Sequence, residues 1–181
     1  IIDSYLKLLG DFPNLKLIIV PRHPERANSV IEIFKNQKIN AVIKSDLNLE
    51  RENSNAIIIN ATGKLDSLYD FAEIAFIGGS LFKKYGGHNL IEAAKNKCAI
   101  IVGPYMKNFE DILNLFKNEN ACVQIESKSE LTNAYKELLN NNELRINMVD
   151  NATEVVANNR GSSDKQFKLS LIHISEPTRQ V

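Results

Sequence analysis

The side chains best suited to chemistry lie in one short stretch of the sequence, where two pairs of glycines flank two lysines. In order, its notable residues are Gly78, Gly79, Ser80, Lys83, Lys84, Gly86, Gly87, His88, Asn89 and Glu92. Glycines placed directly before a helix let an anion reach the unsatisfied N–H groups of the first turn, which carry a partial positive charge. The stretch is therefore typical of a phosphate-binding turn.

Asn89 and Glu92 have two interpretations. Their spacing fits a capping box, in which each side chain accepts a hydrogen bond from a backbone N–H of the first helical turn. The carboxylate of Glu92, one turn into the helix, also suits the hydroxyl groups of a nucleotide ribose, which would donate hydrogen bonds to it. Both interpretations stay open, and for Asn89 they are compatible.

Three further polar residues are candidates at strand ends. Arg22 stands next to Pro21 after an apolar run, and its guanidinium suits a two-pronged contact with a carboxylate or phosphate. His23 either joins that contact, caps the following helix or faces solvent. The residues around Ser80 lack the elbow pattern of hydrolases, so its hydroxyl is expected to bond backbone or phosphate.

Apolar runs of strand length alternate with helical patterns and would position these residues. The predicted strands are residues 15–20, 41–44, 56–60, 74–77, 99–102 and 122–125. The predicted helices are residues 25–36, 65–71, 90–96, 108–117, 127–139 and 143–159, with a polar break at 140–142 and a stop at Gly161. This alternation predicts an α/β fold with a doubly wound, Rossmann-like parallel sheet.

Four unusual loops follow the predicted strands. They are Pro21-Arg22-His23-Pro24, Asn60-Ala61-Thr62-Gly63, Gly78-Gly79-Ser80 and Gly103-Pro104. Ligands of doubly wound sheets bind beyond the carboxyl ends of the strands, where these loops would all open. Glycines let backbone approach a ligand and prolines fix the loop shape, so the four loops together predict a binding cleft.

Composition and the absence of several motifs exclude some classes of function. The 22 basic residues balance 22 acidic ones, which argues against a general attraction to nucleic acid or anionic lipid. Cys98 and Cys122 each start an apolar run, as buried reduced thiols do. The sequence contains no Walker loop, no GxGxxG after a strand and no metal-spaced cluster of His, Cys or carboxylates. We therefore expect no metal and no cofactor at the site.

The two ends of the sequence look foreign to a single native domain. It begins at Ile1 rather than Met, so we expect an upstream portion. Residues 169–179 read LSLIHISEPTR, which resembles a translated sequencing-library adapter. We therefore expect a nucleotide-binding domain over residues 1–168 and a non-native tail over 169–181. The alternative is that residues 170–174 form a short genuine strand.

Four strings in the sequence carry a family resemblance. They are residues 19–26 (IVPRHPER), 76–81 (FIGGSL), 86–89 (GGHN) with Glu92, and Gly103-Pro104 followed by Asn108-Phe109. Their order and spacing resemble the C-terminal domain of Kdo (3-deoxy-D-manno-octulosonic acid) transferases, bacterial enzymes of lipopolysaccharide biosynthesis. The likeness covers residues 15–156. The sequence departs from the family at Leu90 and Ala93, where prolines are usual; leucine can occupy the first helical position without removing the helix.

The resemblance implies one half of a two-domain GT-B fold. In that family the C-terminal domain holds the donor, CMP-Kdo, and the N-terminal domain holds the lipid A precursor. It implies that Arg22 binds charged groups of the donor, that the glycine turn and Asn89 bind its phosphate, and that Glu92 binds ribose. The expected donor-binding residues are Arg22, His23, Gly63, Gly78, Gly79, Ser80, Gly86, Gly87, His88, Asn89 and Glu92.

The resemblance also implies the reaction and its place in the cell. Kdo would be transferred with inversion, while Arg22 and the N–H groups near Asn89 stabilise charge on the departing phosphate. The general base is expected upstream of Ile1, so the chain alone should bind donor without transferring sugar. The intact protein would act at the cytoplasmic face of the inner membrane and touch the membrane only through the upstream part.

Two alternatives remain at this point. The chain could belong to another GT-B glycosyltransferase that uses a UDP-sugar, or it could be a non-catalytic doubly wound binding domain whose glycine turns serve only the fold. Protection against heat by CMP but not by UDP favours the Kdo transferase reading. No stabilisation by any nucleotide favours the non-catalytic one.

Overall fold

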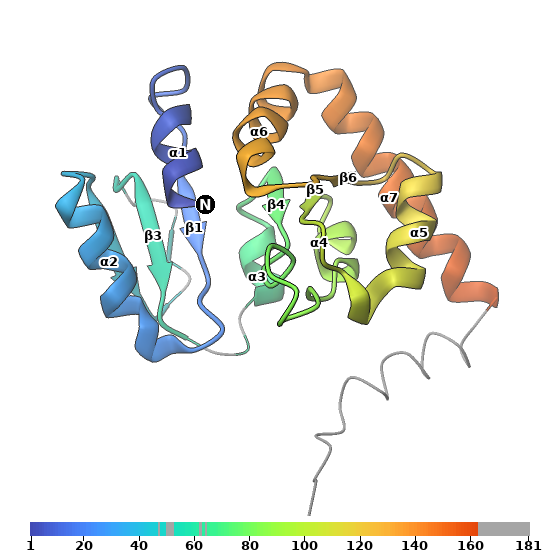
Figure 1. The fold of residues 1–181 in the computed structure, drawn as a ribbon, viewed down its shortest axis with the longest axis horizontal. Helices are drawn as coiled ribbons and strands as arrows, with labels where there is room; N and C mark the ends of the chain where they lie inside the picture. The colour runs from blue at the N-terminus through green and yellow to red at the C-terminus, as the bar shows by residue number, and fades with distance from the viewer. Residues whose placement is uncertain (47, 50–52, 62, 64, 163–181) are drawn as a thin grey trace, which may run out of the picture.

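The computed structural model describes residues 1–46, 48–49, 53–61, 63 and 65–162, which form an α/β fold of parallel strands and covering helices (Figure 1). The proposed tail at 169–181 and Thr62 of the second loop lie outside the described residues. The strands are arranged in two three-stranded sheets, with the orders β1-β3-β2 and β4-β5-β6. The predicted fold class is confirmed, with its strands divided between two sheets.

All six predicted strands are present, and most are shorter than predicted. They are β1 (Leu17–Ile19), β2 (Ala41–Lys44), β3 (Ala56–Ile59), β4 (Ile74–Phe76), β5 (Ala99–Val102) and β6 (Val123–Gln124). The α-helices are α1 (Ile2–Leu8), α2 (Ala27–Asn36), α3 (Leu65–Tyr69), α4 (Ile91–Lys95), α5 (Glu110–Asn118), α6 (Leu131–Asn140) and α7 (Asn142–Ser162). Short 3-10 turns η1 (Pro24–Arg26), η2 (Lys107–Phe109) and η3 (Lys128–Glu130) precede α2, α5 and α6.

The bounds of the predicted helices differ from the structure by a few residues. α7 passes Gly161, and its last described residue, Ser162, lies within the predicted stop at Gly161 and its serines. A glycine inside a helix costs only about 1 kcal/mol relative to alanine, and neighbouring turns can outweigh that cost. The predicted polar break is confirmed, because α6 ends at Asn140 and α7 begins at Asn142.

The second sheet is buried on both faces, which explains its unbroken apolar runs. Successive side chains of β5 point to opposite faces, so Ala99 and Ile101 pack with α6 while Ile100 and Val102 pack with α4, α5 and α7. All four side chains are fully buried. The sheet is therefore a rigid support for the turns that leave β4 and β5.

The first sheet is covered in the same way. Ala56 and Ile58 of β3 pack with Tyr5 of α1 and Phe34 of α2, while the opposite face packs against α3. Tyr5 also donates from its hydroxyl to the carbonyl of Leu15 at 2.9 Å, which fastens α1 beside β1. This helix was not predicted from the sequence.

Contacts between α1 and α6 join the two halves of the molecule (Figure 1). Lys136 Nζ lies 2.6 Å from Asp11 Oδ2, and Lys128 Nζ lies 3.3 Å from Asp3 Oδ2. All four side chains are largely exposed, and such ion pairs each contribute at most about 1 kcal/mol.

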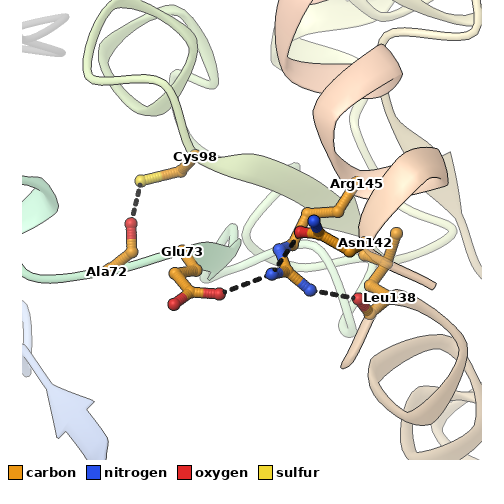
Figure 2. A network of polar contacts seen from close by, with 6 residues as sticks. All are labelled: Ala72, Glu73, Cys98, Leu138, Asn142 and Arg145. Atoms are coloured by element: carbon orange, nitrogen blue, oxygen red, sulfur yellow. Dashed lines mark hydrogen bonds and ion pairs between the residues drawn. The ribbon is translucent and has the colours of Figure 1, made fainter. Parts of the chain in front are cut away.

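Arg145 of α7 connects three elements at the amino ends of the second sheet (Figure 2). Its guanidinium donates to the carbonyl of Leu138 in the last turn of α6 at 2.7 Å and to Asn142 Oδ1 at 2.9 Å. The same group lies 2.9 Å from Glu73 Oε2, just before β4. Arg145 thus satisfies a helix carbonyl and fixes the angle between α6 and α7.

Candidate functional site

The candidate site begins where β4 ends. Ile77 still donates to the carbonyl of Ile101 at 2.9 Å, and the backbone then turns through the first glycine pair. After residues 81–85, Gly87 N–H donates to the carbonyl of Gly79 at 3.3 Å. This hydrogen bond closes a compact loop. The two glycine pairs, eight residues apart in sequence, are therefore neighbours in space.

Glycine is required at two of these positions. Gly79 has a φ of +75°, and a Cβ there would lie 3.2 Å from His88 Nε2. Gly87 has a φ of +79°, and its Cβ would collide with the sulfur of Met106. Side chains other than hydrogen are disfavoured at such φ angles, so the loop needs these glycines with or without a ligand.

The other three predicted glycines differ from one another. A Cβ at Gly86, whose φ is +66°, would lie 2.8 Å from Asn108 Nδ2, whereas at Gly78 it would make only an ordinary contact with His88. Gly63 has a φ of +72°, and apart from its chain neighbours no heavy atom of the described residues lies within 4 Å of a Cβ there. Close packing therefore explains Gly86, and backbone conformation alone explains Gly63.

Ser80 is fully buried and tied to the backbone. Its hydroxyl donates to the carbonyl of Ile77 at 2.6 Å and accepts from the N–H of Gly103 at 2.8 Å. The carbonyl of Ser80 accepts from Tyr105 N–H at 2.9 Å. The hydroxyl was expected to bond either backbone or phosphate, and the structure shows bonds to backbone. The bond to Gly103 joins the turn after β4 to the turn after β5.

Asn89 caps α4. Its Oδ1 accepts a hydrogen bond from Ile91 N–H at 3.0 Å, as the capping interpretation expects. The capped helix has five residues, two fewer than predicted. Among the described residues, the backbone N–H groups of His88 and Asn89 have no hydrogen-bond partner within the protein.

Glu92 lies in the first turn of α4 and is partly exposed. Among the described residues, its carboxylate makes no hydrogen bond and no ion pair, so the reciprocal bond of a capping box is absent there. Its charge is close enough to raise the pKa of Tyr69, after the larger effect of burial. The carboxylate is therefore available to accept hydrogen bonds from a ligand.

Arg22, after β1, is brought near the loop after β4. Burial lowers the pKa of His88, and the positive charge of Arg22 lowers it further. The charge of Arg22 can act on His88 only if the two side chains are near each other, since water screens interactions between distant charges. The loop after β1 therefore lies near the loop after β4.

His23 has an exposed side chain. Its side chain is 61% exposed, and Nδ1 lies 3.6 Å from Glu25 Oε1. It makes no side-chain cap of the following turn. Of its three interpretations, the structure favours the solvent-facing one.

Met106 and Asn108 support the site and were not predicted as part of it. Met106 is buried beneath Gly87, and Asn108 Nδ2 donates to the carbonyl of Tyr85 at 3.1 Å. The sequence alone gives little indication of the role of Met106, because a methionine in a loop cannot be told from any other core residue by its type alone. Both residues pack against the loop and support its shape.

Neither cysteine is part of the site. Burial raises the pKa of Cys98 to about 11 and that of Cys122 to about 12, so both thiols are protonated at neutral pH. Cys98 Sγ donates to the carbonyl of Ala72 at 3.1 Å (Figure 2). The prediction of reduced thiols is confirmed, since both are free.

Two cavities of about 350 and 380 Å³ lie away from the glycine turn. The first is lined by residues 11–15 and Leu139, and the second by residues around Arg145. Across residues 1–162 with their gaps, no three His, Cys, Asp or Glu side chains gather as metal ligands, and no helix is long and apolar enough to span a bilayer.

The fold and the placement of this site define a class of protein. The structure matches the C-terminal domain of a group 1 family glycosyl transferase from Francisella tularensis, with a TM-score of 0.61 at 17% identity over 87% of this chain and 75% of that one. It matches the C-terminal CMP-Kdo binding domain of WaaA from Acinetobacter baumannii more closely, with a TM-score of 0.78 at 28% identity over 86% and 81%. The fold is that of a GT-B glycosyltransferase C-terminal domain.

The sequence comparison finds similar proteins of one kind. The chain is 35% identical over 170 residues to the 3-deoxy-D-manno-octulosonic acid transferase of Haemophilus influenzae, which covers 93% of the chain and 40% of that protein. The chain is homologous to the Kdo transferases and corresponds to their C-terminal domain. It spans about two fifths of the length of that relative. No family model matches the chain.

Proposed function

We propose that the chain binds the donor CMP-Kdo for transfer of Kdo to a lipid A precursor in lipopolysaccharide biosynthesis. The observation that carries this proposal is the compact glycine loop after β4, which Gly87 N–H closes on the carbonyl of Gly79 at 3.3 Å and which leads into the Asn89-capped start of α4. A phosphate beside this loop would meet a guanidinium, free backbone N–H groups and glycines.

Each part of the donor has a chemically suited partner. Arg22 binds the phosphate or the sugar carboxylate, and the N–H groups of His88 and Asn89 donate to phosphate oxygens. The free carboxylate of Glu92 accepts from the ribose hydroxyls. Gly79, Gly86 and Gly87 allow the backbone to approach. The loop that ends at Gly63 borders the cytosine.

The reaction is an inverting displacement at the anomeric carbon of Kdo. An acceptor hydroxyl attacks that carbon, the bond from carbon to phosphate oxygen breaks, and CMP leaves with the electron pair. Arg22 and the free N–H groups stabilise the negative charge that develops on the leaving phosphate. The general base that takes the acceptor proton belongs to a domain outside this chain.

The remaining roles follow from the family. A lipid A precursor binds to an N-terminal domain outside this chain, and neither metal nor nucleic acid takes part. The protein acts at the cytoplasmic face of the inner membrane. We expect the chain alone to bind donor and to transfer no sugar; release of CMP together with a glycosylated lipid acceptor, detected by mass spectrometry, would contradict this.

The test of donor binding compares nucleotides by their effect on thermal unfolding. CMP should raise the midpoint temperature, and UDP should not. Glu92→Gln should weaken CMP binding about tenfold, because a charged acceptor is lost from the ribose contact. Glu110→Gln, which removes an exposed carboxylate at the start of α5, is the matched control and should bind CMP normally. Equal stabilisation by UDP, or unchanged binding in Glu92→Gln, argues against the assignment.

A further inference from the structure

Two loops beside the glycine turns are joined by hydrogen bonds. Residues 81–87 follow the turn after β4, and residues 104–109 follow β5. Asn108 fastens them together, because its N–H donates to the carbonyl of Gly86 and its Nδ2 donates to the carbonyl of Tyr85, both at 3.1 Å. The two loops are therefore held side by side.

Exposed aromatic side chains are concentrated on these two loops. Phe82 is 62% exposed, Tyr85 50% and Tyr105 40%. The described part of the chain has one other aromatic residue so exposed, Phe71, which precedes β4 at the opposite end of the sheet. Three of these four residues thus share two loops, and apolar groups gathered in this way mark a contact surface.

The same loops are basic. Lys83, Lys84 and Lys107 are exposed, and among the described residues none of them forms an ion pair with a carboxylate. Lys84 Nζ lies 5.7 Å from the centre of the Tyr85 ring. Neither loop contains Asp or Glu, and the next carboxylate is Glu110 at the start of α5. This local charge contrasts with the balanced charge of the whole chain.

We propose that this aromatic-basic patch, made of Phe82, Lys83, Lys84, Tyr85, Tyr105 and Lys107, binds the surface of an anionic lipid bilayer. Aromatic rings with an apolar body and a polar edge favour the headgroup region, and lysines nearby are attracted to anionic lipids. Lysine is depleted in protein–protein interfaces, which makes a protein partner a poorer fit. The patch borders the glycine turn, so lipid contact would hold the candidate site close to the bilayer.

Co-sedimentation with vesicles tests the proposal directly. The chain should bind vesicles that contain phosphatidylglycerol more tightly than vesicles of phosphatidylcholine alone, and salt should weaken that binding. The double variant Lys83→Ala/Lys84→Ala should bind anionic vesicles roughly 25-fold more weakly, at about fivefold per lysine. Phe82→Ser should weaken binding to both kinds of vesicle, because it removes apolar insertion.

Matched variants separate the patch from general effects. Lys7→Ala/Lys95→Ala removes two exposed lysines elsewhere, and Phe71→Ser removes the fourth exposed aromatic ring. Both should bind vesicles like the unsubstituted chain. Circular dichroism reports whether each variant is folded. Equal binding to both vesicle types, or equal losses in the control variants, overturns the proposal.

Discussion

At the scale of single residues, the glycines around the candidate site separate two physical effects. Gly87 combines a left-handed backbone with a neighbour that leaves no room for a Cβ, whereas Gly63 has the left-handed backbone and open space. Gly63→Ala should therefore cost about 1–2 kcal/mol for the backbone conformation alone. Gly87→Ala should cost a further ~1–3 kcal/mol for the clash with Met106.

Urea unfolding monitored by circular dichroism measures this difference. The comparison is internal, because both variants add the same methyl group at nearly the same φ. A shorter neighbour should partly relieve the clash, so Met106→Ala is expected to recover some stability when combined with Gly87→Ala. Equal losses in the two single variants would show that Met106 does not constrain the loop.

Residue types indicated candidate site residues, but they did not indicate the contacts that those residues make. Arg22, His88 and Glu92 were identified because charge and spacing are visible in a sequence. The partners of Ser80 could not be predicted, since Gly103 is distant in sequence and becomes a neighbour only when β4 and β5 pair. His23 was ambiguous for the same reason, because its orientation depends on the packing of the whole loop.

At the scale of elements, Arg145 acts on helix geometry more than through its charge. Arg145→Met should lower the free energy of unfolding by about 1–3 kcal/mol, because the buried carbonyl of Leu138 loses its donor. Glu73→Gln should cost about 0–1 kcal/mol, since the carboxylate is 71% exposed and the ion pair is screened by water. Thermal and urea unfolding of the two variants give both values, and a larger loss in Glu73→Gln would contradict this ordering.

Strands were predicted well because a strand buried on both faces is an unbroken apolar run. β2 and β5 have the predicted bounds. α1 was missed because seven residues hold too few turns to show a helical period, and its stability comes from contacts of Tyr5 with distant segments. The helix starts were predicted too early where a 3-10 turn precedes the helix, since both conformations suit the same residues.

At the scale of the whole molecule, the division into two sheets places the site at a junction. Arg22 belongs to the first sheet and the glycine turn to the second, so a ligand there would contact both halves. The sequence predicted the convergence of the loops from the direction of parallel strands. It did not predict that β1 and β4 belong to separate sheets, because backbone pairing between strands depends on how the two halves of the molecule pack together.

The central claim is that a nucleotide phosphate binds beside His88. Burial and Arg22 lower the pKa of this imidazole in the free chain, so it is neutral at pH 7. A bound phosphate carries negative charge and favours the imidazolium, which should raise the pKa. NMR titration of the His88 ring with and without CMP, assigned with His88→Gln, measures this shift. The account predicts an upward shift with CMP, and an unchanged pKa at saturating CMP would contradict it.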